Sequence, residues 1–598
     1  MCGIIGYIGD KDAQSILLDC LKKLEYRGYD SCGFAVDSGD VCVYKNAVRV
    51  EELKKEAPEF KGKIGVAHTR WATHGAPSMI NAHPHLDCTG NIAVVHNGVI
   101  TNFQELRNQL EEEGHNLASE TDTEVIPHLI EKYYDGNLEL AVEQAIKDIE
   151  GSYAIIVLMK GKPELIAAQK YSTLTIGIGD RENFIASDVP AILGHTDRVV
   201  YLEDGDTGVI SRNEVKVRRN GKVVDYDERK VAWNVAEAQK GGYEHFLLKE
   251  IHEQPKVIRD TLGEYTKTAE QIVDLPAVRD KGIESILMVA AGTAYHAALV
   301  GKNIMEELMA VPVRVEAAHE FNYYTNVLSG TLAIAITQSG ETSDTLKAIR
   351  RLKEAGSRVI VISNVVGSTA TRIANQTIYT RAGPEISVAA TKTFIAQLMV
   401  LYWLTMSYSK TDARRLAGLL MELRQLPNKV QQVLDSEDSI QEQARFISRY
   451  DNAYFIGRGL NYPVALEGAL KLKEISYIHA EGYAAGELKH GPFALLGENT
   501  PVIAIVAKDS TYEPMMTNIK QVKARNSPLL AIVGDGEEDG NEAIEELADA
   551  VISVPKVDRV FTPVVNTVVL QLLAYYAAKE RGCPIDYPRN LAKSVTVE

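Results

Sequence analysis

The chain has 598 residues, far more than one hydrophobic core usually supports, so we expect two to four domains of about 100 to 200 residues each. Its 64 Lys and Arg residues against 81 Asp and Glu residues give a net charge of −17. Without a basic stripe, this charge argues against nucleic acid as a partner. A phosphorylated metabolite is still allowed, because backbone N–H groups, hydroxyls and helix N-termini can hold a phosphate locally.

Cysteine use and the first residues indicate a cytoplasmic protein. The six cysteines are few for this length, and no CxxC pair suggests zinc binding or dithiol chemistry. The start, MCGIIGYIGD, has no basic region followed by an apolar one, so we expect no secretory signal. The most apolar stretch, Phe394–Tyr408, is shorter than the roughly 20 residues of a membrane span. It predicts a buried helix, and we expect no membrane partner.

The pattern changes along the chain and predicts its domains. The first part consists of short β-rich runs with helices between them, and residues 220–242 are polar and charged, as in a connection. From residue 283 apolar strands alternate with long amphipathic helices, which predicts parallel sheets flanked by helices. We expect an N-terminal domain at 2–219, a linker with a connecting helix at 220–275, two α/β domains at 276–415 and 444–588, and a C-terminal tail at 589–598.

Cys2 is the first candidate catalytic residue. If Met1 is removed, Cys2 carries a thiol and an α-amine on one carbon, and an amine with a pKa of about 8 can act as general base toward its own thiol. Taken alone, Cys2 could equally be a small residue that begins a strand. The catalytic interpretation is favoured by five polar segments in or beside glycine-marked turns: YRGYDS, HTRWATHG, NAHPH, HNGVITN and SETDTE.

These segments resemble the N-terminal-nucleophile, or class II, glutamine amidotransferases over nearly the whole first domain. The resemblance implies an α+β sandwich of the Ntn-hydrolase type with Cys2 as nucleophile. It also implies that Arg70 pairs with the α-carboxylate of L-glutamine and Asp122 with its α-amine, although the two could instead form a structural salt bridge. Asn97 and the backbone N–H of Gly98 would form the oxyanion hole. The expected glutamine-binding group is completed by Trp71, Thr73 and His74.

Five histidines in these segments do not predict a metal centre. They lack the close spacing with cysteine or carboxylate ligands of a zinc site, and a metal beside a catalytic thiolate would sequester it. We therefore expect no metal and no other cofactor. The five are His68, His74, His83, His85 and His96.

The turn at residues 337–342, in ITQSGETSDTL, joins an apolar strand directly to a helix. Hydroxyls and free N–H groups at such a place suit a phosphate. Helix capping would need one hydroxyl, whereas this turn offers three with a glycine and a glutamine. Because GxxxxGKS and GxGxxG are absent, a nucleotide is not indicated.

The chain contains an internal repeat, so this turn can be compared with the corresponding turn of a second copy. ILMVAAGTAYHAALVGKNIMEEL aligns with AYFIGRGLNYPVALEGALKLKEI, and the next two strands keep the register. Three elements in register argue against chance and predict two α/β domains of about 140 residues. At the place of the phosphate turn the second copy has Lys508 and Asp509, and an acidic residue would repel phosphate. We therefore expect one phosphate site per chain.

The second copy carries a different constellation. Glu467, Lys471 and Glu474 lie at i, i+4 and i+7 on one helical face. A solvated Glu–Lys pair is the ordinary explanation of such spacing. The glycine-rich polar segment that follows and ends at His490 favours a loop over a site instead.

This segment, ITQSGET and the terminal PRNLAKSVTVE are very similar to the sugar-isomerase (SIS) part of the glutamine:fructose-6-phosphate aminotransferase family, and the match runs over essentially the whole chain. The resemblance implies two doubly wound α/β SIS domains with parallel sheets. It implies that Lys593 forms a Schiff base with the carbonyl of fructose 6-phosphate, that His490 assists ring opening and that Glu474 moves a proton between C1 and C2. Lys471 and Glu467 would support these groups. The implied sugar-phosphate contacts are Thr293, Thr337, Gln338, Ser339, Thr342 and Val388.

Three alanines depart from the family pattern. Ala291 and Ala294 lie in AGTA, where many relatives read CGTS, and Ala390 stands where a serine is common. These changes leave the reaction in place but put individual sugar contacts in doubt.

The sequence thus predicts a cytoplasmic enzyme that converts fructose 6-phosphate and glutamine into glucosamine 6-phosphate, the first step of hexosamine and UDP-N-acetylglucosamine synthesis. We expect a covered apolar passage for ammonia from Cys2 to Lys593, with Trp71 as gate, and a homodimer, as is usual in the family. One alternative is another Ntn-type amidotransferase, which would need a magnesium and diphosphate site that we do not find. Others are a non-catalytic sugar-phosphate-binding regulator, which would lack Glu474, His490 and a terminal lysine, and a deglycase acting on another aminosugar.

Overall fold

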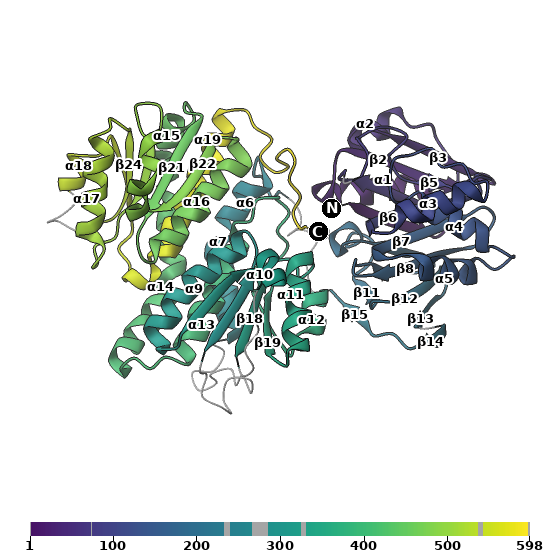
Figure 1. Ribbon diagram of the computed structural model, residues 1–598, viewed down its shortest axis with the longest axis horizontal. Helices are drawn as coiled ribbons and strands as arrows, with labels where there is room; N and C mark the ends of the chain where they lie inside the picture. The colour runs from purple at the N-terminus through teal and green to yellow at the C-terminus, as the bar shows by residue number, and fades with distance from the viewer. Residues whose placement is uncertain are drawn as a thin grey trace. The chain divides into compact units, whose positions relative to one another are not determined.

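A computed structural model describes residues 2–72, 74–219, 221–231, 240–265, 285–324, 331–535 and 542–595. Thr73 and residues 220, 232–239 and 266–275 of the predicted linker lie outside the described residues. The chain divides into two compact units (Figure 1). The first comprises Met1–Ala238, Glu341–Ser343 and Ala592–Glu598, and the second comprises Gln239–Gly340 and Asp344–Leu591.

The first unit is built on two stacked antiparallel sheets. The eight-stranded sheet has the order β15-β11-β9-β10-β1-β4-β2-β3 and the seven-stranded sheet the order β14-β13-β12-β8-β7-β6-β5. The strands of the first sheet are β1 (Gly3–Ile8), β2 (Ser31–Asp37), β3 (Val41–Asn46), β4 (Ile64–Arg70), β9 (Thr175–Ile178), β10 (Asn183–Ala186), β11 (Arg198–Tyr201) and β15 (Glu228–Lys230). Those of the second are β5 (His85–Leu86), β6 (Ile92–Ile100), β7 (Gly151–Met159), β8 (Glu164–Lys170), β12 (Asp206–Ser211), β13 (Val215–Arg219) and β14 (Lys222–Val224).

Apolar side chains fill the space between the two sheets and beneath the helices that cover them. The inner core joins residues of β1, β4, β6, β7 and β8, and every residue of β1 is buried because the strand is covered on both faces. Helix α1 packs on β1 and β4, while α3, α4 and α5 pack on the outer face of the second sheet. The result is the helix-covered sandwich predicted for the N-terminal part. The helices are α1 (Ala13–Lys22), α2 (Val50–Glu56), α3 (Phe103–Glu112), α4 (Val125–Tyr133) and α5 (Leu138–Asp148).

The second unit contains two five-stranded parallel sheets of identical topology. Their orders are β17-β16-β18-β19-β20 and β22-β21-β23-β24-β25, which is the same 2-1-3-4-5 arrangement, so the predicted repeat is confirmed. The strands are β16 (Ile286–Ala290), β17 (Val313–Ala317), β18 (Leu332–Thr337), β19 (Arg358–Ser363) and β20 (Gln376–Tyr379), and β21 (Asn452–Gly457), β22 (His479–Ala484), β23 (Val502–Ile505), β24 (Leu529–Gly534) and β25 (Ala550–Val554).

Helices cover both faces of each parallel sheet, which is why the strands read as continuous apolar runs. One large apolar cluster joins the inner helices of both repeats, and smaller clusters lie on the outer faces. The helices are α6 (Phe246–His252), α7 (Gln254–Tyr265), α9 (Thr293–Met309), α10 (Ala318–Tyr324), α11 (Ser343–Glu354), α12 (Thr369–Ile373), α13 (Lys392–Ser407), α14 (Ala413–Asp435), α15 (Glu437–Ile447), α16 (Asn461–Ser476), α17 (Tyr512–Lys523), α18 (Glu542–Glu545) and α19 (Thr562–Glu580).

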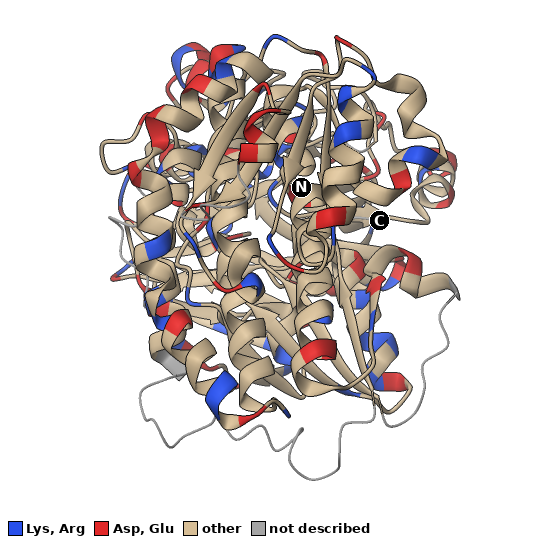
Figure 2. Cartoon of the chain, turned by 90° about the vertical axis from the view of Figure 1, so that its left-hand side faces the viewer, with Lys and Arg blue, Asp and Glu red and all other residues tan. Residues whose placement is uncertain are grey.

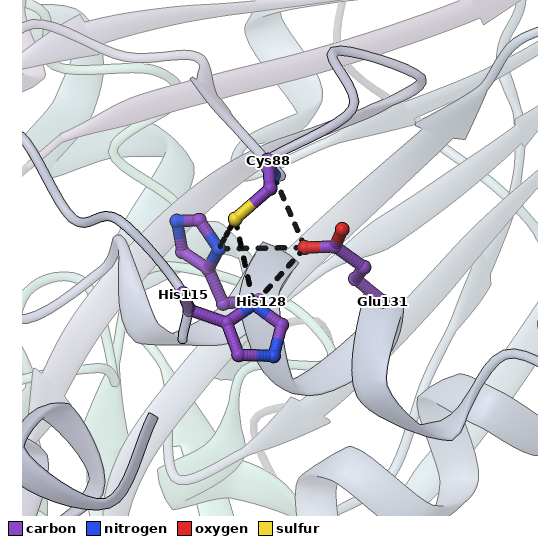
Figure 3. Close-up of side chains that lie close together, drawn as sticks. All are labelled: Cys88, His115, His128 and Glu131. Atoms are coloured by element: carbon purple, nitrogen blue, oxygen red, sulfur yellow. Dashed lines mark hydrogen bonds and ion pairs between the residues drawn. The ribbon is translucent and has the colours of Figure 1, made fainter. Parts of the chain in front are cut away.

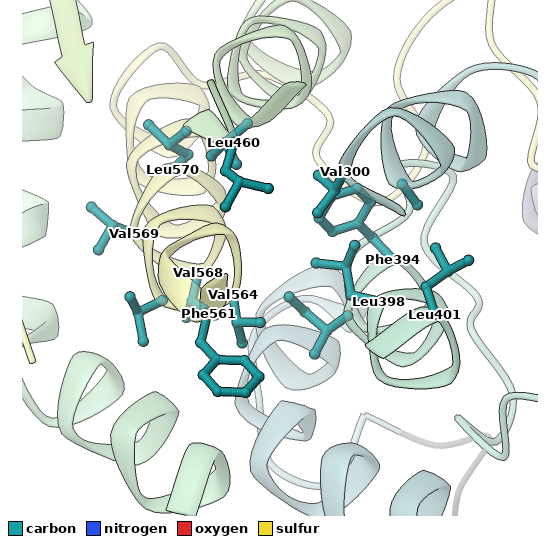
Figure 4. Packing of buried hydrophobic residues seen from close by; sticks show 14 of the residues in the cluster. Val300, Phe394, Leu398, Leu401, Leu460, Phe561, Val564, Val568, Val569 and Leu570 are labelled. Atoms are coloured by element: carbon teal, nitrogen blue, oxygen red, sulfur yellow. The ribbon is translucent and has the colours of Figure 1, made fainter. Parts of the chain in front are cut away.

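The centre of this cluster is formed by two apolar helices. Figure 4 shows Phe394, Leu398 and Leu401 of α13 and Val564 and Val568 of α19 within it. Residues 392–406 of α13 are all buried, so the predicted buried helix is confirmed. The span 559–580 is the one described helical segment long and apolar enough for a membrane, but 94% of its apolar window is buried inside the unit.

Lysine and arginine are interspersed with acidic residues over the face in Figure 2.

Candidate active sites

Cys2 lies immediately before β1, which is held between β10 and β4 near the middle of the eight-stranded sheet. The Cys2 Sγ atom accepts a hydrogen bond from the Trp71 N–H at 3.3 Å. The carbonyl of Cys2 accepts from Asn97 Nδ2 at 2.8 Å and from Arg27 Nε at 3.3 Å. The Trp71 backbone after β4, the Asn97 side chain on β6 and the Arg27 side chain therefore fix this residue.

The surroundings of the thiol both oppose and support its ionisation. Burial raises the pKa of Cys2, while the Trp71 N–H and the charges of Arg70 and Arg27 act in the opposite direction, and the pKa stays above its ordinary value. Because the thiolate is the nucleophilic form, a base must take the proton when the thiol attacks.

The Arg70 guanidinium lies close to Cys2, and part of it has no hydrogen-bond partner among the described residues. Its side chain is nearly buried, and one guanidinium nitrogen donates to the carbonyls of His74 and Gly75. The other, Nη1, is buried and has no hydrogen-bond partner among the described residues. Burial lowers the pKa of Arg70, and nearby Cys2 and Asp122 act against that shift. An anion with two acceptor oxygens would satisfy this group.

Asp122 supplies the opposite charge. It is 4% exposed, and its carboxylate accepts the backbone N–H of Ile100 at 2.8 Å, at the end of β6. Arg70 and Asp122 share no direct ion pair in the described structure, so the structural salt bridge considered above is not formed. The two charges therefore do not neutralise each other by direct contact.

Asn97 and Gly98 lie on β6 next to Cys2. Gly98 has φ = +138°, and a Cβ there would lie 2.1 Å from the carbonyl oxygen of Ser152, so only glycine fits. The Asn97 amide donates to the Cys2 carbonyl, while its Oδ1 is buried without a partner. The described geometry thus brings Asn97 to Cys2.

The histidines near this site contact one another and neighbouring polar groups, and their ring nitrogens do not converge on one point. His68 Nε2 donates to the carbonyl of His96 at 2.9 Å, and its ring stacks on that of His83 with the centroids 4.0 Å apart. His85 Nε2 is hydrogen-bonded to Thr121 Oγ1 at 3.1 Å. Burial lowers the pKa of His68 to about 3 and the pKa values of the other three as well. These rings are neutral packing groups at physiological pH.

A second group of predicted residues lies at the carboxyl ends of β16 and β18. In the order β17-β16-β18 the chain reverses direction across the sheet between these two strands, which is the place where open α/β sheets bind ligands. Gly292 and Thr293 follow β16, and the turn 338–342 follows β18. The sheet therefore brings Thr293 and the predicted phosphate turn to one edge.

Helix α16 of the second repeat carries a charged triad, two of whose members are buried, to Thr293 on α9 of the first repeat. Lys471 Nζ lies 2.6 Å from Glu474 Oε2 and 3.4 Å from Glu467 Oε1, and it donates to Thr293 Oγ1 at 3.1 Å. Thr293 Oγ1 and His296 Nδ1, both on α9, lie 3.1 and 2.7 Å from the two Glu467 oxygens. Helices α9 and α16 are thus joined by a closed polar network, not by a solvated surface pair.

Electrostatics hold Lys471 in its charged form. Burial lowers its pKa, but the carboxylates of Glu467 and Glu474 outweigh this effect and raise the pKa well above the ordinary value. The ammonium is therefore an electrostatic and positioning group, since an amine nucleophile must be neutral.

The turn after β18 is shaped by glycine. Gly340 has φ = +71°, and a Cβ there would lie 2.0 Å from Ser368 Oγ. Its N–H donates to Thr337 Oγ1 at 3.2 Å, and the carbonyl of Gln338 accepts from Asn364 N. The turn passes directly into α11, so its side chains surround a helix N-terminus.

The C-terminal tail is hydrogen-bonded to the first residue of α11: the Ser343 N–H donates to the Val595 carbonyl at 3.0 Å. Lys593, two residues before Val595, is half-buried. Gln338, Ser339 and Thr342 are also half-buried.

The corresponding turn of the second repeat is closed by its own side chains. Asp509 Oδ1 accepts from the N–H and the hydroxyl of Thr511 at 2.8 and 2.6 Å, just before α17. A carboxylate thus occupies the place that an anion would need, in keeping with the prediction of one phosphate site.

Several predicted residues are not brought together with these groups. His490 is exposed and makes no hydrogen bond or ion pair with any described residue. Val388 is buried and its N–H donates to the Asp586 carbonyl at 3.1 Å. His74, in contrast, does lie beside Arg70, whose guanidinium donates to the His74 carbonyl, and its ring packs edge-on against Phe103. Of the three alanines, Ala294 is buried and Ala291 and Ala390 are half-buried.

Sequence reasoning missed four residues that support the sites. His296 follows Thr293 by one helical turn, a spacing that could have revealed it. Glu385 accepts the N–H groups of Thr391 and Thr393 and so fixes the loop that contains Val388. Arg27, from YRGYDS, binds the Cys2 carbonyl, and Asp30 accepts the Ala72 N–H.

Comparisons with known proteins match both parts of the chain. A glutamine amidotransferase domain model matches residues 68–194, and an SIS domain model matches residues 281–407 and 446–581. The glutamine--fructose-6-phosphate aminotransferase [isomerizing] of Caldanaerobacter subterraneus subsp. tengcongensis is 48% identical, and that of Methanosarcina acetivorans 47% identical, each over 100% of both chains. The solved C-terminal domain of glucosamine-fructose-6-phosphate aminotransferase from Francisella tularensis is 37% identical, with a TM-score of 0.56, over 58% of this chain and 100% of that one.

Proposed function

This chain belongs to the family of isomerising glutamine--fructose-6-phosphate aminotransferases, and we propose how its own residues carry out the family's reaction. The enzyme takes the amide nitrogen of glutamine and transfers it to fructose 6-phosphate, giving glucosamine 6-phosphate and glutamate. This is a biosynthetic step toward amino sugars. The observation that carries our assignment is the largely buried Glu467–Lys471–Glu474 triad beside Thr293, on the same chain as Cys2 and Arg70.

In the glutaminase half, Cys2 is the nucleophile. Its α-amine, freed by removal of Met1, takes the thiol proton, and the thiolate attacks the amide carbonyl of glutamine. Asn97 and the Gly98 N–H stabilise the resulting oxyanion, ammonia leaves, and water hydrolyses the thioester to glutamate. Arg70, with its unpaired Nη1, holds the α-carboxylate, and Asp122 holds the α-amine. Trp71, Thr73 and His74 are proposed to complete this pocket.

In the synthase half, Lys593 condenses with C2 of the sugar to form a Schiff base and releases water; ammonia then adds to this carbon and displaces the Lys593 amine, which leaves an imine at C2. Lys471 is unsuited to that role because two carboxylates keep it protonated. Glu474 moves the proton from C1 to C2, so that the aminated ketose becomes an amino aldose, and Lys471 and Glu467 hold it in place. The proposed sugar-phosphate contacts are Thr293, Thr337, Gln338, Ser339, Thr342 and Val388.

We further propose that the enzyme is a cytoplasmic homodimer and that His490 acts in ring opening at the site of the second copy. His490 is exposed and takes no part in the hydrogen bonds of the triad, which supports a role for it at the site of the second copy. Ammonia is proposed to pass from Cys2 to Lys593 without meeting water, where it would be protonated, with Trp71 as gate.

The test is an assay of glucosamine 6-phosphate formation from glutamine. We expect Cys2→Ala to abolish glutamine-dependent product while retaining some synthesis from ammonium salts, and Lys593→Ala to abolish both. Intact-mass measurement of active protein should show loss of Met1. Product formed from glutamine by Cys2→Ala, or full activity with Met1 attached, would overturn the nucleophile assignment.

A further inference from the structure

Four side chains that the reaction does not use converge on one point in the first unit. Cys88 follows β5, His115 follows α3, and His128 and Glu131 lie on α4. Figure 3 shows the Cys88 sulfur, the two ring nitrogens and the Glu131 carboxylate pointing toward one another. One ligand atom from each residue lies within 4.8 Å of all the others.

The distances agree with those of a tetrahedral zinc site. Cys88 Sγ lies 3.5 Å from His115 Nδ1 and 3.4 Å from His128 Nδ1, and Glu131 Oε2 lies 3.1 and 3.5 Å from the same two nitrogens. Zinc bonds of about 2.3 Å to sulfur and about 2.0 to 2.2 Å to nitrogen and oxygen place such ligand pairs about 3.3 to 3.6 Å apart. Four of the six ligand pairs therefore already have nearly the separations that the ion requires, and all six lie within 4.8 Å.

The backbone holds His115 in place independently of any ion. At the end of α3 the His115 N–H donates to the Leu110 carbonyl and the Gly114 N–H to the Glu111 carbonyl. Gly114 has φ = +97°, which completes a Schellman motif. His115 is the residue that this motif fixes just beyond the helix.

The loop that carries Cys88 is equally fixed. Asp87 accepts the N–H groups of Thr89 and Ile92 at 3.3 and 2.8 Å, and the Cys88 N–H donates to Glu131 Oε2 at 3.1 Å. The sulfur thus faces α4 with the loop closed behind it. Because Cys88 is exposed at the surface, an ion can reach the cluster.

The third support is α4 itself, on which His128 and Glu131 stand one turn apart on one face. His128 is 1% exposed, and burial lowers its pKa, so the ring is neutral, the form that binds metals. Burial also raises the pKa of Cys88, and a bound divalent cation would reverse that shift by coordinating the thiolate.

We propose that Cys88, His115, His128 and Glu131 bind one zinc ion, which ties the loop after β5 and the end of α3 to α4. Thiolate and imidazole ligands favour zinc over magnesium or calcium. On binding, the Cys88 thiol releases its proton to solvent. None of the four residues is a proposed contact of glutamine or of the sugar, so the role of the ion is to stabilise the fold. It strengthens α4, which begins shortly after Asp122.

This proposal departs from the expectation of no metal. The five histidines of the amidotransferase segments are different residues, and the four residues of this cluster are not close together in sequence. Here the separations are 27 residues from Cys88 to His115 and 40 to His128, and only the H-x-x-E pair on α4 is local. The cluster of possible ligands can be recognised only in the folded structure, where β5, α3 and α4 lie together.

The test uses untagged full-length protein, loaded with excess zinc chloride, desalted and analysed for metal content. We expect about one zinc per chain in the wild type. Cys88→Ser and His128→Asn should lose it. Cys42→Ser, which removes another cysteine of the same unit, should retain it, and so should Cys2→Ala, which removes the catalytic thiol as an alternative ligand. Glutaminase activity of Cys88→Ser should stay within twofold of the wild type.

Two further measurements keep the test decisive if a variant folds poorly. Cobalt(II) bound to the wild type should show a thiolate-to-cobalt charge-transfer band that Cys42→Ser keeps and Cys88→Ser lacks. Zinc should raise the Tm of the wild type but not of Cys88→Ser. Wild-type protein without retained zinc, equal zinc in Cys88→Ser, or zinc lost with Cys2→Ala would each overturn the proposal.

Discussion

A lysine ammonium is kept between a buried carboxylate, Glu467, and a half-buried one, Glu474, in the synthase half. Lys471 is 2% exposed, and Glu467 is fully buried. Removing the cation would leave two carboxylates without their counter-charge, and breaking such a buried pair costs about 3–5 kcal/mol. Lys471 therefore holds Glu474 in place as well as stabilising the interface of α9 and α16.

Lys471→Met tests this role. We expect glucosamine 6-phosphate synthesis to fall by about 100-fold, because a displaced proton-transfer carboxylate costs on that order, while glutamine hydrolysis continues. Lys473→Met, on the exposed side of the same helix, is the matched control and should behave like the wild type. Equal activity of the two variants would show that Lys471 does not position the catalytic carboxylate.

The buried histidines of the first unit predict how its stability depends on pH. The folded pKa of His68 is lowered to about 3, whereas an unfolded histidine titrates near 6.5. As pH falls below about 6.5, the unfolded chain takes up protons that the folded chain does not, so stability is lost down to about pH 3.

We expect thermal unfolding monitored between pH 7 and 4 to show a smaller loss of Tm in His68→Gln than in the wild type, relative to each protein at pH 7. His319→Gln, at an exposed position, should follow the wild type. An unchanged slope in His68→Gln would contradict the neutral, buried state of this ring.

At the residue scale, the sequence predicted which side chains lie together better than it predicted the individual contacts of each side chain. Cys2 was predicted from its chemistry and Arg70 and Asp122 from the family resemblance, and the fold brings all three to one region. Helical spacing correctly placed Glu467, Lys471 and Glu474 on one face. His296 was missed because its partner, Glu467, lies 171 residues away on another helix.

At the scale of elements, the synthase site depends on how closely β22 approaches α16. A Cβ on Gly482 would lie 2.7 Å from the Leu466 Cα and 2.8 Å from the Ala465 carbonyl oxygen. Because these are backbone atoms of α16, a larger side chain must push the helix away. The displaced segment includes the residue next to Glu467.

Gly482→Ala should therefore lower the Tm and reduce synthesis of glucosamine 6-phosphate, with glutaminase activity retained. Gly497→Ala, where a Cβ would meet no atom within 4 Å, is the control. Wild-type synthesis and Tm in Gly482→Ala would mean that α16 can shift without affecting the site.

The alternation of strands and helices made the second unit predictable at this scale. Apolar runs such as LAIAIT became parallel strands, and the aligned repeat reproduced one strand order twice. The strand order of the antiparallel sheets could not be read from the sequence, because β1 pairs with β4 and β10, which lie far along the chain. Such pairings are set by packing between the sheets, not by local pattern.

At the scale of the whole molecule, the exposure of His490 makes a prediction about assembly. If His490 serves the site of a second copy, an inactive His490→Ala protein mixed with an inactive Lys593→Ala protein should recover activity. Random pairing of two such variants restores about a quarter of the sites, by the combinatorics of a symmetric dimer. A mixture that stays inactive after subunit exchange would place His490 and Lys593 in the same chain's site.

The central claim is that one chain takes nitrogen from glutamine at Cys2 and places it on the sugar at Lys593. The most direct test supplies glutamine labelled with ¹⁵N at the amide, together with unlabelled ammonium and fructose 6-phosphate, and measures the isotope in the product by mass spectrometry. The account predicts glucosamine 6-phosphate that carries ¹⁵N from glutamine in the wild type and only unlabelled nitrogen in Cys2→Ala. Labelled product from Cys2→Ala, or wild-type product with the isotope content of the bulk ammonium, would contradict it.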